Sequence, residues 1–473
     1  MKKFISNFVY QSLFQVIKLL APIITIPIVS HNLGASNIGI YSFLYSITSY
    51  FILFAGLGMQ LYGQRTISRN RDSRKKLSVT FWKLFKFQVI SSLTMFFSFI
   101  ILAYILSYTR LMLLMSLMVL SVLFDISWFF MGIENFRMTS LRSISISILT
   151  LLSTILFVND INDLSKYVVI QSVGLLLSQV IMWPFLKGKV DIVKVEMLDS
   201  LKLLPEVLTY FLPQIGNIIM GSLVTTILGI MQSNFEVAYY ANSMLLVSVI
   251  NTIISTVDTV LLPKMSYLHA TEGIPALLKI LDISLELQIY FTVPAFFGLI
   301  LVSKSLIFWF FGSTFIEVSK LLPIVAPIVI LTPLSSSISR QYLLPIGKLR
   351  DYNISVFMGA VCSTLICLLT IDKLGFYGAA LASVTAQLVV LITRLIPFTK
   401  ETGFKFNLRN ISIYVFAGVI FLIIGRLVTS HMPSAISTTM IQVFIGSSTY
   451  LLITTLLKSN ALLNAIKNRK IEK

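Results

Sequence analysis

Polar side chains recur at helical spacing inside several long apolar segments of this sequence. Steps of three and four residues place such side chains on one face of a helix. Amides on a shared face can hydrogen-bond a polyhydroxylated ligand, and a nearby lysine or arginine can bind a phosphate group. The residues of this kind are Gln11, Gln15 and Lys18 in one segment, Gln60 in the next, Gln214 with Asn217, and Asn251 with Asp258.

The small residues in the same stripes have a second interpretation. Ser46, Ser49 and Gly56 accompany Gln60, and residues of this size let two helices pack closely without contacting a ligand. Packing explains the amides and Lys18 less well. Four such faces therefore predict a shared water-filled cavity.

Signatures of enzymatic chemistry are absent from the sequence. It has no phosphate-binding loop of the Walker type and no helix with paired histidines. Its three histidines, His31, His269 and His431, are far apart in the chain. We therefore expect no catalysis, no cofactor and no metal centre. Any transport must depend on gradients, the membrane potential or substrate supply.

The composition excludes an ordinary water-soluble protein. Hydrophobic residues make up 56% of the 473 residues and charged residues only 12%, whereas soluble domains carry roughly a quarter charged residues. The net charge of +18 would suggest nucleic acid as a partner of a soluble protein. Here the basic residues lie in short connectors, as membrane topology requires, so we expect no nucleic acid.

The apolar segments predict an all-α membrane protein with about fourteen transmembrane helices. A helix needs about twenty apolar residues to cross the hydrocarbon core. Twelve spans is the alternative if two marginal segments are re-entrant or interfacial. The predicted spans lie near residues 8–30, 40–62, 84–107, 111–132, 143–158, 167–186, 208–231, 241–262, 283–303, 322–340, 354–371, 377–396, 411–429 and 436–457.

Alternate connectors differ sharply in basic charge. One set contains the cluster from Arg65 to Lys76 and the basic tail from Lys458, whereas the other set holds little beyond residues such as Arg110 and Lys166. Cytoplasmic loops carry the excess of lysine and arginine. With an even number of spans, the pattern predicts a multi-pass membrane protein with both termini in the cytoplasm.

Charged residues inside the spans need an explanation, because placing one charged side chain at the bilayer centre costs about 2.5–3.5 kcal/mol. Lys18 lies too deep to reach water easily, so we expect it to line a cavity or to pair with a carboxylate such as Asp125. For Asp125, ion pairing, positioning of the segment around Trp128 and substrate contact remain open. Four further charged residues lie near the cytoplasmic helix ends, where we expect the side chains to reach the membrane–water interface (snorkelling). They are Asp258, Glu286, Arg340 and Arg394.

Weak internal repeats suggest two six-helix bundles around a central cavity, followed by two extra helices. Gly- and Tyr-containing corners recur near residues 33–41, 228–240 and 373–378, and transporters are often built from repeated halves. The expected units are residues 1–206 and 207–400, with residues 401–473 forming the extra helices and the basic tail.

Several of these segments resemble a known family. The corner from Ile26 to Tyr41, the run Tyr62-Gly63-Gln64-Arg65, and the segment from Asp125 to Glu134 are similar to those of Wzx-type O-antigen and capsule repeat-unit flippases. So are residues 261–266 and 343–347. The resemblance spans most of residues 4–400. It implies the polysaccharide-exporter branch of the fold shared with multidrug exporters and lipid II flippases.

The resemblance implies a function in O-antigen or capsular polysaccharide synthesis. Such a protein flips undecaprenyl-pyrophosphate-linked oligosaccharide repeat units from the cytoplasmic to the periplasmic or outer leaflet by alternating access. The implied partners are the lipid-linked oligosaccharide and membrane lipid, with a polysaccharide polymerase and a chain-length regulator as further candidates. The candidate cavity residues are Gln11, Gln15, Lys18, Gln60, Arg65, Asp125, Gln214, Asn217, Asn251, Asp258 and Arg340.

Two alternatives remain open at this point. A cation-coupled multidrug exporter of the same fold would need carboxylates near the membrane midplane, whereas the deepest charge here is Lys18. A membrane scaffold for polysaccharide-assembly enzymes would not need polar faces in mid-membrane. Both alternatives therefore explain the polar stripes less well than a flippase does.

Overall fold

The computed structural model describes residues 2–463, with the side chains of residues 2–20, 136, 212, 213, 217, 219 and 259 left out. All regular secondary structure in this part of the chain is helical, as predicted. The chain divides into two compact units, Met1–Thr226 and Ile227–Lys473.

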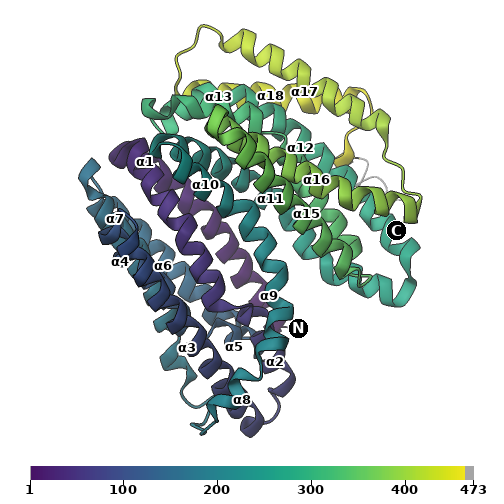
Figure 1. The fold of residues 1–473 in the computed structure, drawn as a ribbon. Helices are drawn as coiled ribbons and strands as arrows, with labels where there is room; N and C mark the ends of the chain where they lie inside the picture. Colours follow the sequence, from purple (N-terminus) through teal and green to yellow (C-terminus); the bar gives the residue numbers. More distant parts are fainter. Residues whose placement is uncertain (1, 464–473) are drawn as a thin grey trace. The chain divides into compact units, whose positions relative to one another are not determined.

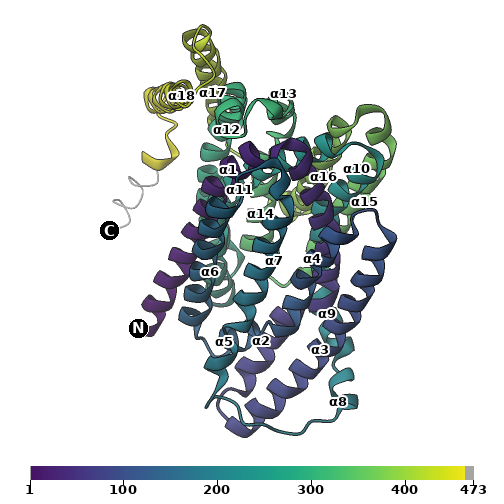
Figure 2. The same cartoon turned by 90° about the vertical axis from the view of Figure 1, so that its left-hand side faces the viewer.

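The first unit is a bundle of long helices joined by short turns. In chain order its elements are α1 (Lys2–Gly56), α2 (Met59–Asn70), α3 (Arg74–Ile105), α4 (Thr109–Ser121), the 3₁₀ turn η1 (Val122–Phe124), α5 (Ser127–Gly132), α6 (Phe136–Phe157), η2 (Ile161–Asp163), α7 (Leu164–Val180), η3 (Trp183–Leu186), α8 (Met197–Leu201), α9 (Leu204–Ile218) and the π-helical η4 (Ile219–Leu223). The next helix, α10 (Val224–Met231), begins in this unit. Figure 1 shows α3, α4, α6 and α7 side by side, and Figure 2 shows the short α8 beside one end of α3.

The second unit contains the longest uninterrupted helices and the two extra ones. Its elements are α11 (Asn234–Glu272), α12 (Ile274–Phe310), η5 (Ser313–Phe315), α13 (Ile316–Val325), α14 (Ile328–Ser337), the π-helical η6 (Ile338–Leu343), α15 (Leu349–Leu374), α16 (Phe376–Thr402), α17 (Leu408–Thr429) and α18 (Ile436–Leu456). The last two helices pack against each other and against α12, as Figure 1 shows.

The predicted membrane architecture is confirmed. Within the described residues, 12 helices are long and apolar enough to cross a membrane, or up to 13 if one bent pair is counted as a span. The first of them, Ala21–Asn70, contains much of the first two predicted spans, because α1 is continuous except at Gly34, where φ is 73°. Glycine accepts a positive φ without a steric penalty, which explains the break at the predicted Leu33-Gly34 corner.

The tenth predicted span, 322–340, is broken. Two helical pieces, Ser313–Val325 and Ile328–Leu343, meet at an angle of 47° around Ala326 and Pro327. Proline lacks the amide hydrogen that would continue the helical ladder, so a bend is expected there. The second piece ends as the π-helix η6, and such insertions are frequent at functional sites.

Each unit has its own apolar core. In the first unit Phe81, Trp128 and Phe129 are buried together, with ring centroids of Phe81 and Trp128 5.5 Å apart. In the second unit Leu281 and Phe398 belong to one cluster, and Tyr290 and Tyr414 belong to another, formed by α12, α17 and α18. Packing of this kind fixes the backbone on which the polar residues lie.

Candidate functional site

The side chains of four predicted cavity residues lie outside the described part. Gln11, Gln15 and Lys18 are in the first half of α1, and Asn217 is near the end of α9. Their predicted role in a cavity therefore remains a prediction from the sequence.

Two small residues of the stripe that contains Gln60 form contacts between helices of the first unit. The hydroxyls of Ser46 and Thr226 lie 2.8 Å apart, and Ser49 donates to Ser222 at 2.8 Å. These contacts join α1 to η4 and the beginning of α10. The packing interpretation therefore applies to both serines.

Arg65 belongs to an aromatic and acidic cluster between α2 and α9. Its guanidinium donates a hydrogen bond to the hydroxyl of Tyr210 and lies 5.9 Å from the centroid of that ring. The neighbouring Tyr62 donates to Glu206 at 2.7 Å. Arg65 and Gln60 are both exposed, so α2 presents a cation and an amide that an anionic ligand could reach.

Asp125 is part of a network that positions the Trp128 segment. Its Oδ1 atom accepts the backbone N–H of Ser127 at 2.8 Å, at the beginning of α5. The buried Gln88 of α3 donates to the Asp125 carbonyl at 2.8 Å and accepts from the indole of Trp128 at 2.8 Å. These bonds satisfy backbone groups where the fourth span breaks between α4 and α5, as a membrane interior requires.

An ion pair between Arg71 and Glu134 lies just after α2 and just after the Trp128 segment, outside the candidate spans. Arg71 and Glu134 approach to 2.6 Å, and this contact raises the pKa of Arg71 above its usual value. Both side chains are well exposed, so the pair contributes little stability. It marks the end of α2 as a neighbour of the Trp128 segment.

The buried carboxylate of Asp258 is the centre of a polar cluster in the second unit. Its Oδ1 atom accepts three hydrogen bonds of 2.7 Å, from Gln288 of α12, Ser337 of α14 and Gln341 of η6. Gln341 also donates to Ser284 at 2.8 Å. All five side chains are at least nine-tenths buried.

The expectation that Asp258 and Arg394 snorkel is wrong. Asp258 is 0% exposed and Arg394 6% exposed. The Arg394 guanidinium of α16 donates to the Ser335 carbonyl at 2.9 Å and the Ser355 hydroxyl at 2.8 Å, and it lies 5.0 Å from the Tyr352 ring centroid. Helices packed on all sides supply these partners, so the side chains need not reach the interface.

The remaining predicted residues are spread over the two units. Gln214 of α9 is half-buried and donates to the Tyr210 carbonyl one turn earlier at 3.3 Å. Asn251 of α11 has a buried Oδ1 atom without a hydrogen-bond donor. Arg340 of η6 is exposed, in contrast to its neighbours in the Asp258 cluster.

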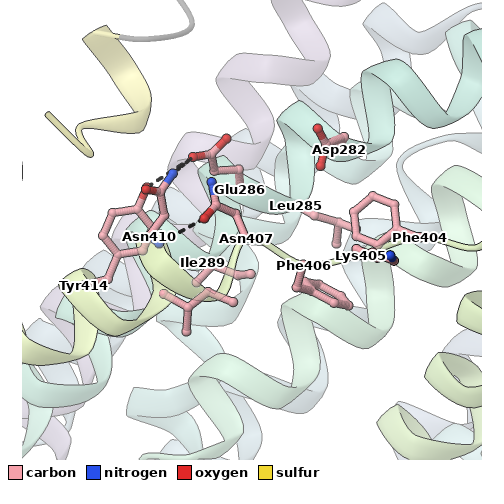
Figure 3. Close-up of a pocket in the computed structure, with 11 residues that line it drawn as sticks. Asp282, Leu285, Glu286, Ile289, Phe404, Lys405, Phe406, Asn407, Asn410 and Tyr414 are labelled. Carbon is pink, nitrogen blue, oxygen red and sulfur yellow. Dashed lines mark hydrogen bonds between the residues drawn. The ribbon is translucent and has the colours of Figure 1, made fainter.

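A cavity of about 150 Å³ lies between α12 and the beginning of α17, and residues 404–407 also line it. Figure 3 shows Glu286 at its edge, where it accepts from the Asn410 amide at 2.5 Å. Tyr414 lies 3.4 Å from the same oxygen and donates to the Ser459 carbonyl at 2.9 Å. Glu286 therefore joins α17 to α12. This contact gives the half-buried Glu286 a structural role.

The sequence interpretation missed Gln288, Gln341, Ser284 and Ser337. Ser284 and Gln288 are four residues apart on α12, and Ser337 and Gln341 are four apart on the next broken span. The spacing used for the other stripes would have found both pairs. In the described residues no group of three or more His, Cys, Asp or Glu side chains lies close enough to hold a metal ion.

Comparison with known sequences identifies a family. The protein-family model described as "Polysaccharide biosynthesis protein" matches residues 4–269, so the chain belongs to this family. A curated relative, the "Putative O-antigen transporter" of Escherichia coli (strain K12), is 27% identical over 180 residues, which cover 37% of this chain and 43% of that protein. The match thus spans less than half of the relative's length.

Solved structures with the same fold are membrane transporters. The lipid II flippase MurJ, in an inward closed conformation, aligns with a TM-score of 0.74 at 16% identity, over 97% of this chain and 100% of that one. An inward-facing multidrug resistance MATE family transporter of the MOP superfamily aligns with a TM-score of 0.60 at 15% identity, over 84% and 99% of the two chains. The fold is the one that these MOP-superfamily proteins share, which confirms the predicted fold class, an all-helical multi-pass membrane protein.

Proposed function

Because the chain belongs to the polysaccharide biosynthesis protein family and has a MOP-superfamily fold, we propose that it flips polyprenyl-pyrophosphate-linked oligosaccharide repeat units across the cytoplasmic membrane. The observation that carries this proposal is the family match, which covers residues 4–269. This range includes residues 4–226 of the first unit and α11 up to His269. The units would be delivered to the outer leaflet for O-antigen or capsule synthesis.

The chemistry of the substrate explains several polar residues. A pyrophosphate needs a cation, the sugars need amides and hydroxyls, and the polyprenyl tail needs an apolar surface. Exposed Arg65 and Arg340 offer cations, and we assign Lys18 the same role from its depth in the first span. The exposed Gln60 and the half-buried Gln214 and Asn251 offer amides.

The two-unit organisation supports alternating access as the mechanism. Each unit has its own buried core, so each can move as a rigid body. The membrane potential favours the outward step, because moving one charge through 100 mV is worth about 2.3 kcal/mol. An inside-negative potential thus favours export of an anionic headgroup.

The multidrug-exporter alternative is less well supported by the acidic residues. Asp258 is 0% exposed and its Oδ1 atom already accepts three hydrogen bonds. A drug-sized organic cation would have to disrupt this packed cluster to contact the carboxylate. The scaffold alternative does not account for buried charge in the spans.

A deletion strain tests the proposal against both alternatives. We expect loss of the gene to abolish the surface polysaccharide and to leave the lipid-linked repeat unit on the cytoplasmic leaflet, with drug susceptibility unchanged. Complementation with the intact chain should restore the polysaccharide. An unchanged polysaccharide together with increased susceptibility to cationic drugs would instead identify a multidrug exporter. A repeat unit that reaches the outer leaflet in the deletion strain would contradict flipping and support a scaffold.

A further inference from the structure

The cavity between α12 and the beginning of α17 is lined by charges of both signs. Asp282 and Glu286 lie one turn apart on α12, and Lys405 lies in the connector that leads into α17. Figure 3 shows the Asp282 carboxylate and the Lys405 amine at separate places around the cavity. Within the described residues, neither of these two side chains forms an ion pair or a hydrogen bond. The cavity thus offers an anionic end and a cationic group that do not neutralise each other.

Hydrogen bonds hold part of the cavity wall in place. Asn410 donates to Oε1 of Glu286 at 2.5 Å and accepts from the Ser459 hydroxyl at 2.6 Å. Tyr414, which also lines the cavity, donates to the Ser459 carbonyl at 2.9 Å. The second carboxylate oxygen of Glu286 accepts no hydrogen bond in the part of the chain that the structure describes. A ligand that donates hydrogen bonds can therefore use free acceptors on Asp282 and Glu286 without disturbing this packing.

The cavity lies at the level of the lipid headgroups. Leu408 begins both α17 and a candidate membrane span, and residues 404–407 precede it. On α12, Glu286 is the last charged residue before an uncharged run that extends to Ser303. Such a change from charged to apolar residues marks the boundary between the headgroup region and the hydrocarbon core. Two neighbouring helices thus place the cavity where a phospholipid carries its phosphate.

We propose that this cavity binds the headgroup of a bilayer phospholipid that carries both a primary amine and a phosphate, as phosphatidylethanolamine does. The ammonium group donates hydrogen bonds to Asp282 and Glu286, and the phosphate pairs with Lys405. A cavity of about 150 Å³ has room for several water molecules at about 30 Å³ each, and therefore for a compact headgroup of this kind. The bound lipid would join α12 to the connector before α17.

The lining favours this headgroup over the other common ones. A phosphatidylglycerol headgroup has no cation, so its phosphate would approach Asp282 and Glu286 without neutralising either carboxylate. A phosphocholine headgroup has a cation, but its methylated nitrogen donates no hydrogen bond to a carboxylate. A lipid is favoured over a soluble ligand because α17 exposes Leu408 and Phe416, whose apolar side chains can contact acyl chains beside the cavity.

Thermal unfolding of the purified full-length protein in lipid nanodiscs tests the site. The discs contain phosphatidylcholine alone, or phosphatidylcholine with added phosphatidylethanolamine or phosphatidylglycerol. We expect only phosphatidylethanolamine to raise Tm by several degrees, because a ligand that binds the folded state stabilises it. Asp282→Asn and Lys405→Gln should each remove most of this rise. Glu272→Gln and Lys400→Gln, which alter exposed charges of α11 and α16 away from the cavity, are the matched controls and should retain it.

A titration in detergent gives the affinity directly. Short-chain phosphatidylethanolamine should bind Asp282→Asn and Lys405→Gln about tenfold more weakly than the wild type, as expected for the loss of one charge-assisted hydrogen bond. Soluble phosphoethanolamine, which has the same polar group without acyl chains, separates the two sources of this chemistry. A rise in Tm with the soluble compound and no further rise with the lipid would overturn the assignment to a phospholipid.

Two other results would overturn the proposal. One is a wild-type Tm that is the same in discs with phosphatidylethanolamine as in discs with phosphatidylglycerol or phosphatidylcholine alone. The other is a response to phosphatidylethanolamine that Asp282→Asn and Lys405→Gln leave unchanged. Because none of these measurements depends on polysaccharide export, their outcome is independent of the proposed function.

Discussion

The Nε2 atom of Gln341 lies 2.7 Å from the Oδ1 atom of Asp258 and 2.8 Å from the hydroxyl of Ser284. One amide thus joins the π-helix η6 to both α11 and α12. The contact bridges 83 residues of chain and ties the second half of the broken span to the two longest helices of its unit. The stability of this unit should therefore depend on a single glutamine.

Gln341→Leu is expected to lower the free energy of unfolding by about 1.5–3 kcal/mol, the value of a hydrogen bond to a charged group. The change also leaves Ser284 with one partner fewer. Thermal unfolding of the purified protein measures the effect. Gln60→Leu, on the exposed face of α2, is the matched control and should change stability by no more than about 0.5 kcal/mol. Equal melting temperatures for the two variants would contradict the structural role of Gln341.

Gln88→Leu is expected to destabilise the first unit. Gln88 is 1% exposed, and its loss would leave the Trp128 indole and the Asp125 carbonyl without their partner. Each buried group left unsatisfied costs about 1–3 kcal/mol. Gln171→Leu is the control, because Gln171 is half-buried and makes no hydrogen bond within the described residues. If Gln88→Leu unfolds at the same temperature as the control, the network does not hold this segment.

Variants of Asp125 separate capping from ion pairing. Asparagine can still accept the Ser127 N–H that Asp125 accepts at 2.8 Å, so Asp125→Asn should retain nearly wild-type abundance and polysaccharide export. Asp125→Ala should lose about 1 kcal/mol of stability, as expected for a lost helix cap. If both variants lose export equally, the charge itself is required and pairing with a buried cation is favoured.

Cysteine labelling tests the proposed orientation. In a background with Cys362→Ala and Cys367→Ala, Ser36→Cys should react with a membrane-impermeant reagent added outside intact cells. Ser73→Cys, beside the basic cluster, should react only after the membrane is opened. The asymmetry of basic connectors is the physical reason. Labelling of position 36 only from the cytoplasm would invert the topology.

Lys18 distinguishes a pyrophosphate substrate from a cationic one. Lys18→Ala and Lys18→Gln both remove the deepest positive charge, so both should block surface polysaccharide and cause the lipid-linked unit to accumulate on the cytoplasmic leaflet. Lys18→Arg should retain partial function, because it keeps the charge but changes the donor geometry. The surface polysaccharide and the membrane level of each variant are measured together. Full export by a well-expressed Lys18→Gln protein would exclude the headgroup role.

The membrane architecture could be predicted because the bilayer imposes a local rule on the sequence. A span needs a long apolar run, whatever it packs against, so even the short fifth and eleventh predicted spans correspond to helices, Arg137–Phe157 and Leu349–Leu374. The bend in the tenth span was not predicted. Pro327 was visible in the sequence, but proline occurs within continuous helices of this protein as well, such as Pro294 in α12.

Whether the charged residues are buried depends on neighbours that the sequence alone does not identify. Composition and spacing determined that Asp258 and Arg394 lie on membrane helices, and hydropathy alone suggested that they reach water. Only the tertiary structure decided that both are buried, because their partners, Gln341 for Asp258 and Ser335 for Arg394, are far away in the chain. A charge avoids the interface when packed helices supply its hydrogen bonds. That supply is a property of helix packing, not of any single span.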